Sequence, residues 1–156
     1  NDLSALILID PGGFEMNGVS DKPVHAPAMV AGYLRSPSKM AVTYGVKKTY
    51  GDPSKIPMGR IDEIIAFMRQ PGNGDAMVEV INTFDLPDPT ALMAKIKAPT
   101  LVLWGDKDTT IPREHALLFK QKISGAKLVV LDNIGHTPQE EAPTKTAIKI
   151  KEFLQH

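Results

Sequence analysis

Two apolar runs in the second half of the chain, each followed by a glycine-containing polar loop, constrain the fold more than any other feature. Residues 99–104 lead into a loop with Asp108, and residues 127–132 lead into a loop with His136. Short runs that are apolar on both faces are typical of buried strands in a parallel sheet. Functional groups in such sheets gather at the carboxyl ends of the strands. We therefore expect the two loops to lie side by side.

Helical patterns follow both strand-like runs. One covers residues 112–123, and the other covers residues 140–154, where the carboxylates of Glu140 and Glu141 suit the first turn of a helix. A further strand-like run, residues 3–9, comes at the start of the chain and ends in a turn rich in glycine and proline. It needs a neighbouring strand on each side. The alternation of strands and helices predicts an α/β fold with parallel strands joined by crossover helices.

The stretch from residue 14 to residue 89 differs in texture, because it holds no strand-like run. Short helical patterns broken by proline or glycine succeed one another there, over residues 26–34, 39–50, 60–69 and 75–84. All seven methionines lie between Met16 and Met93. Methionine side chains either fill gaps between loosely packed helices or form a deformable apolar wall over a binding pocket. We divide the chain into a core strand and turn (1–13), a helical cap (14–90) and a C-terminal α/β segment (91–156).

The acidic loop and the histidine loop carry the candidate catalytic groups. If a carboxylate of the first loop meets the imidazole of His136, it fixes the tautomer of the ring, which can then act as a general base. Asp106 and Asp108 compete for the role of the acid, and Asp106 can instead accept hydrogen bonds from the loop backbone. Taken singly, each residue is typical of an ordinary loop. An acid and a histidine at successive strand ends together favour a catalytic pair.

Residues 98–156 closely resemble the C-terminal part of the α/β-hydrolase fold. The matching segments are Ala-Pro-Thr-Leu-Val-Leu-Trp-Gly-Asp-Lys-Asp at 98–108, Ile111-Pro112, and Gly-His-Thr-Pro-Gln-Glu-Glu-Ala-Pro at 135–143. The resemblance implies the C-terminal half of an α/β-hydrolase parallel sheet with an inserted helical cap. In that family the chain order is nucleophile, acid, histidine. By this resemblance Asp108 is the acid and His136 is the histidine of a Ser-His-Asp triad.

The same resemblance implies a serine hydrolase that cleaves carboxylic esters or lactones through an acyl-enzyme. The serine elbow, Gly-x-Ser-x-Gly, is expected roughly 20–30 residues before Leu3, and no serine of the chain has that context. The first residue is Asn rather than Met, so we expect a truncated or cleaved chain whose serine lies outside it. We expect this chain alone to be inactive, and to associate with the missing N-terminal half or with itself. The expected substrate is a small, apolar, ester-like molecule, with three flanking residues as substrate-binding candidates: Phe14, Ile111 and Thr137.

Other functions of the same fold stay open. Epoxide hydrolases and haloalkane dehalogenases use an aspartate as nucleophile, and carbon–carbon bond hydrolases loosely resemble the segment Asp10-Pro-Gly-Gly-Phe14. A third reading is a non-catalytic fragment or interaction module, since unpaired strand edges bind partner strands readily. The residue at the nucleophile position decides between the enzymes, and activity of the isolated chain decides between an enzyme and a module.

Composition argues against several other classes. The chain has 18 basic and 18 acidic residues, which gives no electrostatic basis for binding nucleic acid. No apolar stretch approaches the ~20 residues that span a bilayer. There is no cysteine, and His25, His115 and His156 lack the spacing of zinc ligands, so we expect no metal and no cofactor. His115 lies in a predicted helix and should be half-exposed. A soluble protein is expected, the compartment being undetermined with a slight preference for the cytoplasm.

Overall fold

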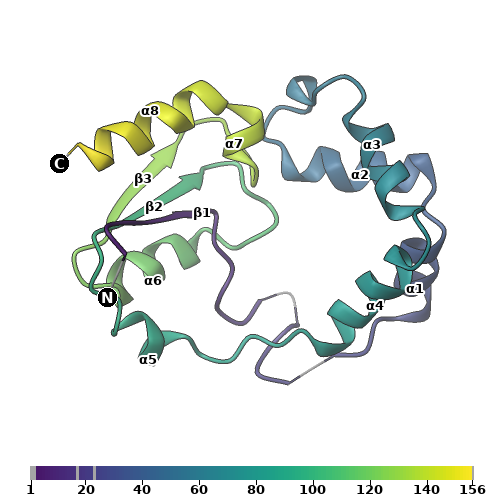
Figure 1. Cartoon of the computed structure of the whole chain (residues 1–156), viewed down its shortest axis with the longest axis horizontal. Helices are drawn as coiled ribbons and strands as arrows, with labels where there is room; N and C mark the ends of the chain where they lie inside the picture. Colours follow the sequence, from purple (N-terminus) through teal and green to yellow (C-terminus); the bar gives the residue numbers. More distant parts are fainter. Residues whose placement is uncertain (1–2, 17, 23, 156) are drawn as a thin grey trace.

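A parallel three-stranded sheet forms the base of the structure, a computed structural model that describes residues 3–16, 18–22 and 24–155. The strands are β1 (Leu6–Ile9), β2 (Thr100–Gly105) and β3 (Lys127–Leu131), and they lie in the order β1-β2-β3 (Figure 1). The parallel pairing and the crossover helices confirm the α/β fold that the alternation of the sequence predicts. Because the strands run in one direction, the loops that follow them open at one edge of the sheet.

Strand β2 is the most deeply buried element. All six of its residues are buried, because β1 and β3 flank it and helices α6 (Glu114–Lys122) and α8 (Pro143–Leu154) lie on opposite sides of the sheet (Figure 1). Val102 and Trp104 pack in one cluster with Phe119 of α6. Complete burial of an aliphatic side chain such as that of Val102 contributes about 1.5–3 kcal/mol. The loop with Asp108 therefore starts from the most firmly held point of the fold.

Strand β1 lies at the edge of the sheet. It begins at Leu6 rather than at Leu3, and its four residues are half-buried. The sequence predicts neighbours on both sides of this strand. In the described part of the chain it pairs with β2 alone, so the backbone groups of its outer edge have no strand partner there.

The middle of the chain forms four helices, close to the predicted ranges. They are α1 (Ala28–Arg35), α2 (Lys39–Thr49), α3 (Arg60–Met68) and α4 (Asn73–Thr83). Helix α1 packs against α4 and α2 packs against α3, and these helices bury a cluster separate from the one at the sheet. In Figure 1 they stand beside the sheet, which they approach where α2 meets α7 (Pro138–Glu141). We call residues 28–83 the helical segment.

Two short helices were not predicted. The 3-10 helix η1 (Pro53–Lys55) follows α2, and α5 (Thr90–Met93) precedes β2. Each is too short to produce the recurring apolar spacing by which longer helices are recognised in a sequence. Helix α5 contributes the buried Met93 to the cluster beneath the sheet.

Two expectations were wrong. The helix predicted over residues 140–154 is divided into α7 and α8, because Pro143 opens α8 and Ala142 has a non-helical φ of −141°. A proline disfavours the helical conformation of the residue before it. His115 is only 6% exposed rather than half-exposed. The Phe14 ring lies edge-on to its imidazole, with 5.5 Å between the ring centroids, and helps to cover it.

The two loops at the end of the sheet touch through glycine. A side chain at Gly105 would collide with the carbonyl oxygens of Ile134 and Gly135. The loops are also joined by a hydrogen bond of 2.8 Å from the Lys107 amide to the Ile134 carbonyl. This close backbone approach requires glycine, since any larger residue would separate the loops.

We predict that Gly105→Ala lowers the free energy of unfolding by at least about 2 kcal/mol, because the new methyl group overlaps backbone that has no room to shift. Gly32→Ala is the matched control: a methyl group at this position in α1 meets nothing within 4 Å, and alanine favours a helix by about 0.5–1 kcal/mol over glycine. Urea unfolding of both variants measures the difference. Wild-type stability of Gly105→Ala would show that the loops do not approach as described.

Candidate active site

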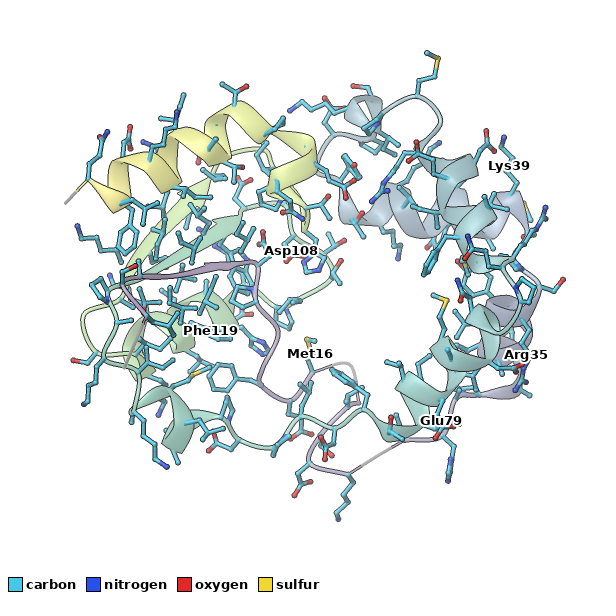
Figure 2. All side chains as sticks on the ribbon, in the orientation of Figure 1. Met16, Arg35, Lys39, Glu79, Asp108 and Phe119 are labelled. Atoms are coloured by element: carbon cyan, nitrogen blue, oxygen red, sulfur yellow. The ribbon has the colours of Figure 1, made fainter. Side chains whose placement is uncertain are left out.

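Asp108 lies in the loop after β2, at the edge of the sheet that faces the helical segment (Figure 2). Its side chain has no exposed surface. The Oδ1 atom accepts hydrogen bonds from the amides of Thr110 at 2.7 Å and Ile111 at 3.1 Å. These two bonds orient the carboxylate and leave Oδ2 to face the neighbouring loop.

His136 lies in the loop after β3, and its imidazole meets that oxygen. The distance from His136 Nδ1 to Asp108 Oδ2 is 2.9 Å. The main chain of the histidine is held separately, because its amide donates a 2.7 Å hydrogen bond to the carbonyl of Thr49 at the end of α2. The contact between an acid and a histidine that the two strand ends predict is therefore present. The imidazole remains 25% exposed, so the far side of the ring can reach a reactant.

The electrostatics of the pair favour an ionised acid beside a basic histidine. Burial alone would raise the pKa of Asp108, but the hydrogen bonds from His136, Thr110 and Ile111 outweigh it and hold this pKa below its usual 3.8. The hydrogen bond to Asp108 raises the pKa of His136 above its usual 6.5, against the opposing effect of burial. An imidazole made more basic in this way is suited to accept a proton during a reaction.

Asp106, the competing acid, has a different partner. Its Oδ1 accepts a hydrogen bond of 3.3 Å from the Ile134 amide. The carboxylate therefore joins the two loops through the backbone, which is the alternative role that the sequence leaves open. Asp108 is the carboxylate that contacts the His136 ring.

Asp10 is a third ionisable group at the site, to which the sequence gives no role beyond its place in the turn that carbon–carbon bond hydrolases loosely resemble. It follows β1, is 3% exposed and has a left-handed φ of 40°. Its Oδ1 accepts a hydrogen bond of 2.9 Å from the Gly105 amide, and its Oδ2 is buried without a partner. The strand-end argument that selected Asp108 and His136 applies equally to this aspartate, and would have found it.

The surroundings of Asp10 disfavour its charge. Burial, opposed by the hydrogen bond from Gly105 and assisted by the nearby Asp108, raises the pKa of Asp10 to about 7. Side-chain atoms of Asp10, Asp108 and His136 lie within 4.8 Å of one another, close enough to surround a metal ion. Two of the three groups are joined directly, by the hydrogen bond between His136 Nδ1 and Asp108 Oδ2, whereas the printed hydrogen bond of Asp10 comes from the Gly105 amide.

The three substrate-binding candidates lie in different surroundings. Thr137 follows the histidine and borders a cavity of about 290 Å³ beside the helical segment. Ile111 is 4% exposed and belongs to the cluster beneath the sheet. Phe14 packs edge-on against His115 and Phe119. Packing accounts for Ile111 and Phe14, and a substrate role for any of the three stays a prediction.

The chain belongs to the α/β-hydrolase fold family, whose sequence pattern matches residues 19–143. Lipase 1 of Psychrobacter immobilis is 38% identical over 77 residues, which are 49% of this chain and 24% of the lipase. Monoacylglycerol lipase ABHD6 of Mus musculus is 32% identical over 105 residues, or 65% of this chain and 30% of that protein. The chain thus matches about a quarter to a third of the length of these relatives.

A solved structure shows the same fold. The 2-hydroxy-6-oxo-6-phenylhexa-2,4-dienoate hydrolase of Rhodococcus sp. strain RHA1 superposes with a TM-score of 0.74 at 21% identity, over 97% of this chain and 54% of that one.

Within the described residues, no helix has both the length and the apolar character needed to cross a bilayer.

We predict that Asp10 makes the protein less stable as the pH rises from about 4 to about 7. An aspartate whose pKa is raised in the folded state holds its proton there while the unfolded chain has already lost it, so folding is penalised progressively through this window. A rise from 3.8 to about 7 corresponds to about 4 kcal/mol. Asp10→Asn keeps an oxygen for the Gly105 amide and removes the titration. Urea unfolding at pH 5 and pH 7.5 should show a smaller loss of stability in this variant; an equal loss in both proteins would contradict the assignment.

Proposed function

We propose that this chain is the part of a serine hydrolase that carries the catalytic histidine and acid, and that the enzyme cleaves carboxylic esters. The observation that carries the proposal is the 2.9 Å contact of His136 Nδ1 with Asp108 Oδ2, made by a fully buried carboxylate and a partly exposed ring. This geometry fixes the tautomer in which Nε2 can accept a proton. Family membership and the similarity to two lipases support the same assignment.

The reaction would proceed in two halves. A serine hydroxyl attacks the ester carbonyl while Nε2 of His136 takes its proton, and Asp108 stabilises the imidazolium that results. The tetrahedral intermediate then collapses, the alcohol leaves with that proton, and an acyl-enzyme remains. Water attacks the acyl-enzyme with His136 again accepting a proton, and the carboxylic acid and the free serine are released. The oxyanion of each intermediate needs backbone N–H donors.

The serine in this proposal lies outside residues 1–156. Two of the described serine hydroxyls have other partners: Ser38 caps α2 and Ser54 donates to Asp52. No hydrogen bond joins a described serine to the imidazole. The outer edge of β1 is the expected contact for the chain that brings the nucleophile, because a strand edge without a partner presents backbone donors and acceptors. Residues 14–90 would form the cap over that site.

An apolar group on the substrate fits the surroundings of Thr137. The cavity of about 290 Å³ beside it is lined mainly by apolar side chains of the helical segment, among them Val42, Val46, Ile64, Met68 and Met77. Met68 and Met77 belong to this wall and also pack in the cluster of the helical segment, so they fit both explanations for the methionine-rich segment. An ester with an apolar acyl or alcohol part is the substrate class we propose.

Labelling with a fluorophosphonate tests the proposal. We expect the full-length protein from its source cells to be labelled on a serine that maps outside residues 1–156, and to lose ester hydrolysis in proportion. The isolated 156-residue chain should be neither labelled nor active. Ester turnover by a protein that resists labelling would indicate an aspartate nucleophile instead, and labelling of a serine within the chain would overturn the proposed division of the site.

We predict that His136→Ala reduces turnover of the full-length enzyme by about 10³-fold or more, because triad residues act as a unit. Asp108→Asn should reduce turnover by a similar factor, since the amide favours the wrong tautomer of the histidine. Asp106→Asn serves as the control, because Asp106 contacts the Ile134 backbone and not the ring. Measured kcat values for a soluble ester decide the matter, and a near-normal rate in either of the first two variants would remove that residue from its role.

A further inference from the structure

Glu141 is a charged residue buried at the junction of the sheet and the helical segment. It ends α7, and its side chain has no exposed surface. A carboxylate so placed is stable only when it is well supplied with hydrogen bonds. The sequence offers no feature that distinguishes Glu141 from Glu140, because both were predicted to lie in the first turn of a helix.

The carboxylate of Glu141 accepts three backbone hydrogen bonds from two distant parts of the chain. Oε2 accepts one of 2.7 Å from the Gly135 amide, next to His136, and one of 2.9 Å from the Gly51 amide. Oε1 accepts one of 2.8 Å from Asp52, and Lys55 Nζ stands 4.0 Å away. One carboxylate thus holds the histidine loop against the turn that follows α2. These donors supply the hydrogen bonds that a buried carboxylate needs.

The two backbone segments leave no room between them. A side chain on Gly51 would come within 2.9 Å of the Gly135 nitrogen. The His136 amide donates to the Thr49 carbonyl across the same contact, at 2.7 Å. The turn after α2 and the loop of the histidine are therefore joined both at Gly135 and at the main chain of His136 itself.

From this geometry we propose that Glu141 is a positioning residue for His136. Its carboxylate fixes the histidine loop on residues 49–52, so that the imidazole stays in line with Asp108 only while the helical segment is docked. The consequence for catalysis rests on the proposed function of His136. A misplacement of about 1 Å costs about 10²-fold in rate, so movement of the helical segment would be transmitted to the reactive ring.

Glu140 provides the matched control. It is adjacent in sequence and also joins the helical segment to α7, but it accepts hydrogen bonds from Tyr50 at 2.9 Å and from Arg60 at 2.7 and 3.1 Å. Its side chain is 31% exposed, and that side chain makes no described hydrogen bond to the histidine loop. Glu140→Gln changes the same charge at the same junction and leaves the Gly135 amide alone.

The test is NMR of the ¹⁵N-labelled 156-residue chain, with the Nδ1 proton of His136 and the amide exchange rates as readouts. In Glu141→Gln the side chain keeps its shape but offers one acceptor oxygen instead of two. We expect amide exchange at Gly51, Asp52 and Gly135 to accelerate at least about tenfold relative to the strands, and the His136 proton signal to shift or broaden. Glu140→Gln should leave that signal and the Gly135 exchange rate within about twofold of the wild type.

A second variant acts from the other side of the contact. Gly51→Ala keeps the carboxylate but displaces the turn, and it should shift the His136 signal as Glu141→Gln does. An unchanged His136 signal in either variant would overturn the proposal. Uniformly faster exchange throughout the sheet with a normal His136 signal would overturn it too, because it would show a purely structural role.

These readouts need no turnover, so they separate the two proposals. A shifted His136 signal in a protein whose full-length form lacks esterase activity would sustain the positioning role and reject the proposed function. In an active full-length enzyme, Glu141→Gln should lower kcat about tenfold or more with little change in KM. Normal kcat together with a normal signal would reject the positioning role alone.

Discussion

One hydrogen bond organises the site: the 2.9 Å contact between the buried carboxylate of Asp108 and the imidazole of His136. The acid is held by two backbone amides, and the histidine is held by the end of α2. The glycine contact between Gly105 and Gly135 brings the two loops close enough to meet. The rigid, fully buried β2 supplies the fixed point from which these distances are set.

The strands, five of the helices (α1–α4 and α6) and the acid–histidine pair could be predicted, because each rests on a local pattern. The run that forms β2 is apolar on both faces because both faces are buried. Because β2 and β3 run parallel, the loops that follow them lie at the same edge of the sheet. The choice of Asp108 over Asp106 did not follow from local pattern. It came from resemblance to a family, and the different partners of the two carboxylates agree with it.

Three features could not be predicted because they depend on what packs across the chain. Glu141 and Glu140 look alike in the sequence and differ only in their partners in the fold. The amides of the turn after α2 donate to Glu141, whereas Arg60 donates to Glu140. The burial of His115 depends on contacts from elsewhere in the chain, among them the Phe14 ring that lies edge-on to its imidazole. The place of Asp10 at a strand end can be read from the sequence, but its raised pKa arises from burial beside Asp108. In each case the missing information is tertiary.

Asp108 orients the His136 imidazole and stabilises its protonated form. An NMR titration of the His136 imidazole in the wild-type chain and in Asp108→Asn tests this most directly. The structure predicts a His136 pKa above the usual 6.5 in the wild type, because the carboxylate stabilises the imidazolium. It predicts a lower value in the variant, where that charge is gone. A wild-type pKa at or below 6.5 that does not respond to the substitution would contradict the account.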